Sequence, residues 1–164
     1  MRLVVFQWMN LRSCGRFVLG ESFDDEDTDA EGLVRTVVPT RTFLEKLFLL
    51  AEEFQKEKPR SVRMSRHLYD LEKLMDTEYG KEALSNRKLY NSIVEHRKAY
   101  YALKYVNYDL HVPSTINFTI PESVIEAWQD DYADMRRFFI YGESLEFDEL
   151  MQKMRELQER VRIM

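Results

Sequence analysis

Cysteine, glycine and proline are scarce in this chain, and each shortage excludes a class of protein. The 164 residues contain one cysteine, Cys14, which excludes an internal disulfide and predicts a reducing, cytoplasmic setting. No apolar run approaches the ~20 residues of a membrane span. The opening apolar run breaks at Gln7, which argues against a signal peptide. Five glycines and four prolines, beside abundant Leu, Glu, Lys, Arg and Met, favour helix.

Familiar catalytic and metal motifs are also missing. The sequence contains no glycine-rich phosphate loop, no nucleophile elbow and no cysteine-based metal site. His67, His96 and His111 have no second histidine or cysteine at metal spacing, so we predict no metal ligands. The formal charge of −5 argues against bulk attraction to nucleic acid, although a local basic patch is compatible with it. What is present is 45% hydrophobic and 32% charged residues, a globular composition of one-domain size.

The first 39 residues have weak β character around an acidic run. Apolar and aromatic residues predict a strand over Leu3–Met9 and another over Leu33–Val38. Between them, Asp24–Asp29 has two interpretations: an Asp-x-Asp pair for a divalent ion, or a solvated loop. The lack of hydrophobic flanks favours the loop. We therefore predict a short β-containing N-terminal remnant over residues 1–39.

Helical periodicity begins at Thr42, which has capping-box spacing to Glu45 and is predicted to be the N-cap. Lys46 then falls in or near the first turn, at the border of the apolar stripe. One interpretation is a lysine whose stem covers apolar surface while its charge stays in water. The other is a lysine held beside helix N–H groups to meet an anion such as a phosphate.

A second helix follows Pro59, with Ser61 or Ser65 as its cap. Asp70 lies just off its apolar stripe, and three basic side chains share its side of the helix. These are Arg63, Arg66 and His67. Either Arg66 and Asp70 form a weak surface ion pair, or the cations keep the carboxylate ionised at the lip of a cleft.

Three further segments complete a mainly α fold. We predict a long helix or bent pair over Ala83–Lys104, a helix opened by Pro121 and closed by Gly142, and a last helix over Leu145–Val161. Basic residues among the tyrosines of 96–108 either stack on a nucleic-acid strand or form half-buried core. Residues 40–164 are thus predicted to be a helical, bundle-like domain of about five helices.

Five stretches, taken in order, resemble the AbiEii/AbiGii-type nucleotidyltransferase toxins of bacterial abortive-infection and toxin–antitoxin systems. The likeness covers about Val37 to the C-terminus. The stretches are Arg41–Leu47, Ser65–Leu71, Val94–Arg97, Asp130–Met135 and Tyr141–Leu150.

This resemblance implies transfer of a nucleotide from a nucleoside triphosphate (NTP), with Mg²⁺, to an acceptor that is tRNA in some relatives. An antitoxin protein is the implied partner, and no membrane is involved. Lys46 matches a family lysine expected to touch the nucleotide phosphates, and Asp70 an aspartate that supports the catalytic site. Arg63 and Arg66 are added as nucleotide-binding candidates, and His67 replaces the family's usual first aspartate of that motif.

The family's Gly-Gly-Thr/Ser turn and Asp-x-Asp pair have no clear counterpart before Lys46. Phosphoryl transfer depends on positioning and on metal-assisted charge stabilisation. We therefore predict that this chain is the C-terminal portion of such an enzyme. By itself the chain is predicted to be inactive and to bind neither Mg²⁺ nor NTP. The rival hypothesis is a non-catalytic helical module for protein interaction or regulation. A third is an active transferase that takes its metal from Asp24–Asp29.

Overall fold

The computed structural model describes residues 16–18, 31–33 and 37–164, in two units divided between Val38 and Pro39. In the first unit, β1 (Arg16–Val18) pairs antiparallel with β2 (Glu31–Leu33). The strand expected over residues 3–9 and the acidic run 24–29 lie outside the described residues. The β-containing remnant therefore stays a prediction.

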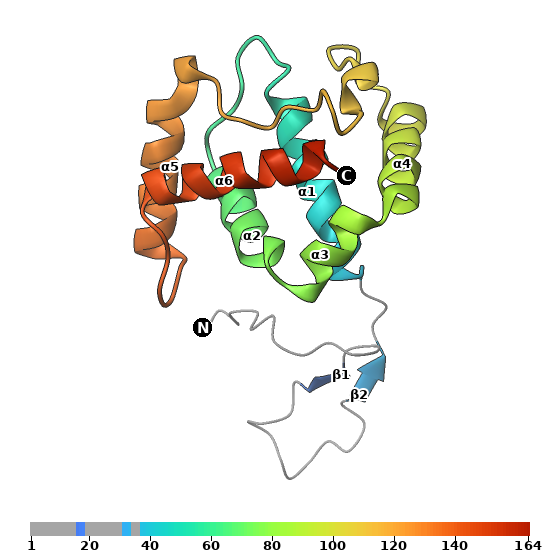
Figure 1. Ribbon diagram of the computed structural model, residues 1–164. Coiled ribbons are helices and arrows are strands. Elements are labelled where there is room, and N and C mark those ends of the chain that lie inside the picture. Colours follow the sequence, from blue (N-terminus) through green and yellow to red (C-terminus); the bar gives the residue numbers. More distant parts are fainter. Residues whose placement is uncertain (1–15, 19–30, 34–36) are drawn as a thin grey trace. The chain divides into compact units, whose positions relative to one another are not determined.

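The second unit is mainly helical, as predicted, and six α-helices are described in it (Figure 1). They are α1 (Pro39–Glu53), α2 (Ser65–Met75), α3 (Glu78–Ser85), α4 (Arg87–His96), α5 (Ile125–Phe138) and α6 (Phe147–Arg162). A π-helical turn, η1 (Arg97–Tyr101), continues α4, and two short 3₁₀ turns are η2 (Tyr108–His111) and η3 (Glu122–Val124).

The segment predicted as one long helix or a bent pair is interrupted at Asn86. The side chain of Asn86 accepts a hydrogen bond from the Leu89 N–H at 2.9 Å and so caps α4. The helix before the break, α3, begins earlier than predicted because Thr77 caps it. Gly80 lets α3 approach the end of α2, since a Cβ there would lie 2.3 Å from the Leu74 carbonyl oxygen.

Helix α1 forms the centre of the packing, in contact with α2, α3 and α4, while α6 packs across α2 (Figure 1). The apolar stripes predicted for these helices are buried. The largest fully buried side chains are Trp128, Tyr90, Tyr132, Phe43, Phe48, Phe118, Leu44, Leu47, Leu50, Leu68, Leu71 and Met75. At about 25 cal/mol per Å² of apolar surface, this shared core is the main source of stability.

Two predicted helix boundaries are wrong. Helix α1 begins at Pro39, so Thr42 lies inside it rather than capping it, and the preceding residues 37 and 38 are not in a strand. Proline suits the first position of a helix, where its missing N–H costs nothing. Gly142 does not close α5, which ends at Phe138; its positive φ of 121° instead serves the connection to α6.

The connection before α5 is not a strand, although its apolar residues alternate as those of a strand do. Ile116, Phe118 and Ile120 are buried alternately. Their backbone pairs with a side chain: Gln158 donates to the Ile116 carbonyl at 2.7 Å and accepts from the Phe118 N–H at 3.2 Å. One glutamine of α6 thus substitutes for a neighbouring strand.

Among the described residues, no helix has both the length and the apolar character needed to cross a membrane.

Candidate functional site

An ion pair joins the two candidate residues, Lys46 of α1 and Asp70 of α2. Lys46 Nζ lies 2.6 Å from Asp70 Oδ2, although the residues are 24 positions apart in the sequence. Both side chains are half-buried, at 21% and 31% exposed. A pair of this exposure stabilises the fold by about 1 kcal/mol or less, so its importance lies in where it places the charges.

One interpretation of the sequence placed Lys46 beside free helix N–H groups, and the structure does not place it there. Because α1 begins at Pro39, Lys46 is two turns into the helix, where every N–H has an intrahelical partner. The anion-binding interpretation of this lysine must therefore depend on its own charge and on its neighbours rather than on the helix terminus.

The arginines predicted beside Asp70 occupy different positions. Arg66 is exposed on the first turn of α2, and within the described part of the chain no ion pair connects it to Asp70. Arg63 precedes the helix, with a left-handed φ of 58°, so the helical-face argument does not apply to it. The cation that holds Asp70 comes from the other helix.

His67 is buried next to this pair, at 8% exposed. Burial, followed by the positive charges of Lys46, Arg66 and Arg60, lowers the pKa of His67 to about 4. The imidazole is therefore neutral at pH 7. Its Nδ1 has no hydrogen-bond partner among the described residues. Where the family has a carboxylate, this chain has a neutral ring surrounded by cations.

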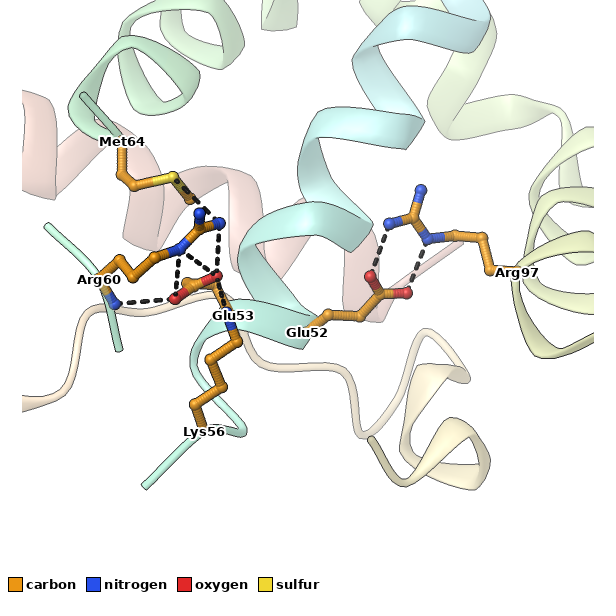
Figure 2. Close-up of polar contacts among 6 residues, drawn as sticks. All are labelled: Glu52, Glu53, Lys56, Arg60, Met64 and Arg97. Carbon is orange, nitrogen blue, oxygen red and sulfur yellow. Dashed lines mark hydrogen bonds and ion pairs between the residues drawn. The ribbon is translucent and has the colours of Figure 1, made fainter. Parts of the chain in front are cut away.

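A second ionic cluster lies at the end of α1, centred on Glu53 (Figure 2). Arg60 donates to the Glu53 carboxylate from its backbone N–H at 2.8 Å and from its guanidinium at 3.1 Å, and Lys56 Nζ lies 2.6 Å away. Burial acts to raise the pKa of Glu53, but the hydrogen bonds from Arg60 and Lys56 outweigh it, and that pKa is lowered. The cluster fixes the loop after α1 against the helix.

A third cluster binds the opposite side of α1 to η1 (Figure 2). Arg97 is buried and donates two bonds to Glu52, at 2.7 Å and 2.6 Å, and a further one to Glu45. Burial acts to lower the pKa of Arg97, but the hydrogen bond and charge of Glu52, aided by Glu45, raise it. Arg97 is thus a permanent cation held between two carboxylates.

The three clusters follow from the helical period of α1. Lys46 and Glu53 are seven residues apart and contact α2 and its loop, whereas Glu45 and Glu52, also seven apart, contact η1. The seven-residue spacing of these charged side chains on α1 can be read from the sequence, but the residues that they bind cannot. Sequence reasoning therefore missed the Glu52 and Arg97 pair.

The start of α2 is held by a residue of another helix. Its N-cap, Met64, makes no side-chain cap bond. Instead Asp131 of α5 accepts hydrogen bonds from the backbone N–H of Arg63 at 2.5 Å, the N–H of Ser65 at 2.9 Å and the Ser65 hydroxyl at 2.5 Å. Asp131 therefore occupies the positive end of the helix that carries Asp70.

We expect Asp131→Ala to lower the free energy of unfolding by about 2–3 kcal/mol, because hydrogen bonds to a charged acceptor are lost and the buried Ser65 is left unpaired. Urea denaturation followed by circular dichroism measures this loss. The matched control is Asp130→Ala at the adjacent exposed carboxylate, with an expected change within about 0.5 kcal/mol. Equal losses in both variants would contradict the capping role.

The described residues do not by themselves fit a magnesium ion. No group of three or more His, Cys, Asp or Glu side chains that could hold a metal is present in the part of the chain that the structure covers. Asp70 is already engaged by Lys46. Mg²⁺ prefers several oxygen ligands in near-octahedral geometry, so one lysine-paired carboxylate is an incomplete set.

The fold and these contacts define a helical domain with a lysine–aspartate pair beside a cation-rich, half-buried surface. A family model described as nucleotidyl transferase AbiEii toxin, type IV TA system, matches residues 14–153. The chain belongs to this family, which confirms the resemblance found in the sequence. No curated protein and no solved structure matches the chain.

Proposed function

We propose that this chain forms the helical, phosphate-facing half of a nucleotidyltransferase toxin that moves a nucleotide from an NTP to an acceptor such as tRNA. The observation that carries the proposal is the 2.6 Å pair of Lys46 and Asp70, because it brings together the two residues that the sequence resemblance assigns to motifs of the family. The family's toxin–antitoxin context makes an antitoxin protein the expected partner.

In this proposal Lys46 binds the phosphates of the NTP. Its ammonium group is half-exposed and held by one carboxylate oxygen, so an incoming phosphate competes with Asp70 for the same protons. Arg66 and Arg63, exposed at the start of α2, add positive charge nearby. His67 is neutral, so it does not repel an incoming phosphate as the family's carboxylate would.

Asp70 has the supporting role. When the phosphate takes over Lys46, the Asp70 carboxylate is left at the edge of the bound nucleotide, where it can orient or deprotonate the acceptor hydroxyl.

Magnesium, and the glycine turn and Asp-x-Asp pair that grip the triphosphate, belong to the complete enzyme. Because the described residues do not complete a magnesium site, we assign no step of the reaction to that ion. We infer that this chain alone does not transfer nucleotides, and that transfer requires a segment that carries both motifs.

Transfer of radioactive nucleotide to tRNA tests the proposal. We expect no magnesium-dependent labelling by the chain alone. In a protein that also carries the glycine turn and the Asp-x-Asp pair, Lys46→Ala and Asp70→Asn should each reduce labelling about 100-fold or more, the cost of losing one electrostatic or acid–base group at a reacting centre.

The matched control is Lys153→Ala, which removes another half-exposed, ion-paired lysine and should leave labelling unchanged. Labelling by the chain alone would show that the two motifs are not needed. Full labelling by the Lys46 and Asp70 variants would show that the site lies elsewhere.

A second candidate function is a non-catalytic module that binds the antitoxin. It is favoured by an apolar patch at the end of α5, where Phe138, Phe139 and Tyr141 are 55%, 59% and 72% exposed. Contiguous exposed aromatic surface is typical of a protein interface. This function does not use Lys46, so the labelling experiment separates the two candidates.

A further inference from the structure

Three exposed tyrosines lie on and directly after the π-helical turn η1. Tyr100, Tyr101 and Tyr105 are 77%, 52% and 44% exposed. One interpretation of the sequence made the tyrosines of 96–108 half-buried core, and for Tyr100 that interpretation is wrong. The π-helical turn changes the period after α4, so the spacing that predicts an inward side chain on an α-helix no longer applies.

The turn that presents these rings is held in place from inside. Arg97 is bound to Glu52 and Glu45, and its carbonyl accepts the hydrogen bond of the Ala102 N–H at 3.2 Å, which closes the π turn. Ala102 then adopts a left-handed φ of 43°, a conformation that is unfavourable for a residue with a Cβ. Single π turns of this kind are frequent at functional sites.

Positive charge accompanies the rings. The ten residues 96–105 contain Arg97, Lys98 and Lys104 and no carboxylate, although the whole chain has a formal charge of −5. The Arg97 guanidinium lies 4.8 Å from the centroid of the Tyr101 ring. Lys56 Nζ lies 5.4 Å from the centroid of the Tyr105 ring.

Not all of this charge is available to a ligand. Glu45 and Glu52 bind Arg97, and Glu53 binds Lys56. Lys98 has only a long, exposed contact of 3.4 Å with Asp109. Lys104 is exposed and has no ion pair among the described residues. The two exposed lysines thus flank Tyr100 and Tyr101, the two more exposed of these three tyrosines, along the chain.

We propose that this surface, defined by Lys98, Tyr100, Tyr101, Lys104 and Tyr105, binds single-stranded RNA. Bases stack on the exposed rings, and phosphates contact the lysines, which is the usual arrangement for binding a strand with little sequence preference. The charge favours a polyanion as the occupant, because Lys98 and Lys104 are both exposed and Lys104 has no ion pair among the described residues.

The choice of RNA rests on the proposed function, in which the acceptor is an RNA, but binding of the strand uses none of the transfer machinery. Helix α1 connects the two: Glu45 binds Arg97 at the base of the turn, and the next residue, Lys46, binds Asp70 on another side of the helix.

Fluorescence anisotropy of a short labelled oligouridylate tests the proposal, with the full chain and without NTP or magnesium. We expect Tyr100→Ala/Tyr101→Ala to weaken binding about 30-fold or more, since two stacked bases are lost and each contributes about 1–3 kcal/mol. Tyr100→Phe/Tyr101→Phe keeps the rings and should bind as the wild type does. Lys98→Ala/Lys104→Ala should weaken binding and reduce the salt-dependence slope by about 1.4.

The matched control is Phe138→Ala/Tyr141→Ala, which removes two equally exposed rings at the end of α5 and should not change RNA binding. The proposal is overturned if the wild type does not bind the oligonucleotide at low salt, or if the control loses as much affinity as the tyrosine variant. It is also overturned if the tyrosine variant binds RNA normally but loses the antitoxin. Lys46→Ala should still bind RNA, so failure of transfer and failure of RNA binding are distinguishable.

Discussion

Replacement of Arg97 by methionine should destabilise the protein by about 3–5 kcal/mol, the usual cost of leaving a buried charge without its partner. The variant keeps most of the volume of the side chain but removes both bonds to Glu52, which is 4% exposed. The variant also removes the side-chain contacts that hold the π-helical turn η1 against α1. Urea denaturation at pH 7, followed by circular dichroism, measures the change.

A double variant shows whether the unpaired carboxylate causes this loss. Glu52→Gln/Arg97→Met replaces the buried charges with neutral groups, and replacement of a whole buried ion pair is often close to neutral. We therefore expect it to recover more than half of the stability lost in Arg97→Met. Lys98→Ala, at the adjacent exposed position, should change stability by about 0.5 kcal/mol or less. If the double variant is as unstable as Arg97→Met, lost packing rather than charge explains the effect.

The second large effect is a loss of stability at mildly acid pH caused by His67. The pKa of this side chain is lowered to about 4 in the folded protein, whereas an unfolded histidine has a pKa of about 6.5. Between pH 6.5 and 4, His67 is therefore protonated in the unfolded chain but stays neutral in the folded chain. Stability is full above pH 6.5 and falls as the pH is lowered towards 4, by about 3 kcal/mol in total from this group.

The variant His67→Gln should flatten this part of the stability curve between pH 6.5 and 4.5. The pKa of buried His111 is also lowered, first by burial, so His111→Gln should remove a further part of the slope. Below that window, carboxylates whose pKa is lowered, such as Glu53 and Asp76, begin to contribute. Urea denaturation at a series of pH values measures the slope. An unchanged slope in His67→Gln would show that the buried imidazole is not the group that titrates.

The helices were predictable because their stability comes from local spacing. The stripes of α1, α2 and α6 have the helical period, and the residues that form them are buried. A helix boundary was less predictable where it depends on a residue that is distant in the sequence. Asp131 holds the start of α2 from 66 positions away in the sequence, and no local pattern indicates this contact.

In the candidate site too, local features could be predicted from the sequence but contacts between distant residues could not. Lys46 and Asp70 could be singled out by their places at the edges of two stripes and by family resemblance, but not as a pair. Spacing along one helix suggested Arg66 as the partner of Asp70, whereas the packing of α1 against α2 brings Lys46 to it. Contacts between helices depend on the whole fold, and spacing along a single sequence does not show them.

Binding of a labelled NTP to a protein that also carries the glycine turn and the Asp-x-Asp pair is the most direct test of the phosphate-facing role of Lys46. Measured by equilibrium dialysis, Lys46→Ala should weaken binding about tenfold or more, because a charge-assisted bond contributes about 1.5–3 kcal/mol. Asp70→Asn should bind NTP at least as tightly as the wild type, since it removes the carboxylate that competes for Lys46. If both variants lose affinity equally, or neither does, the pair is a structural contact and Lys46 does not bind phosphate.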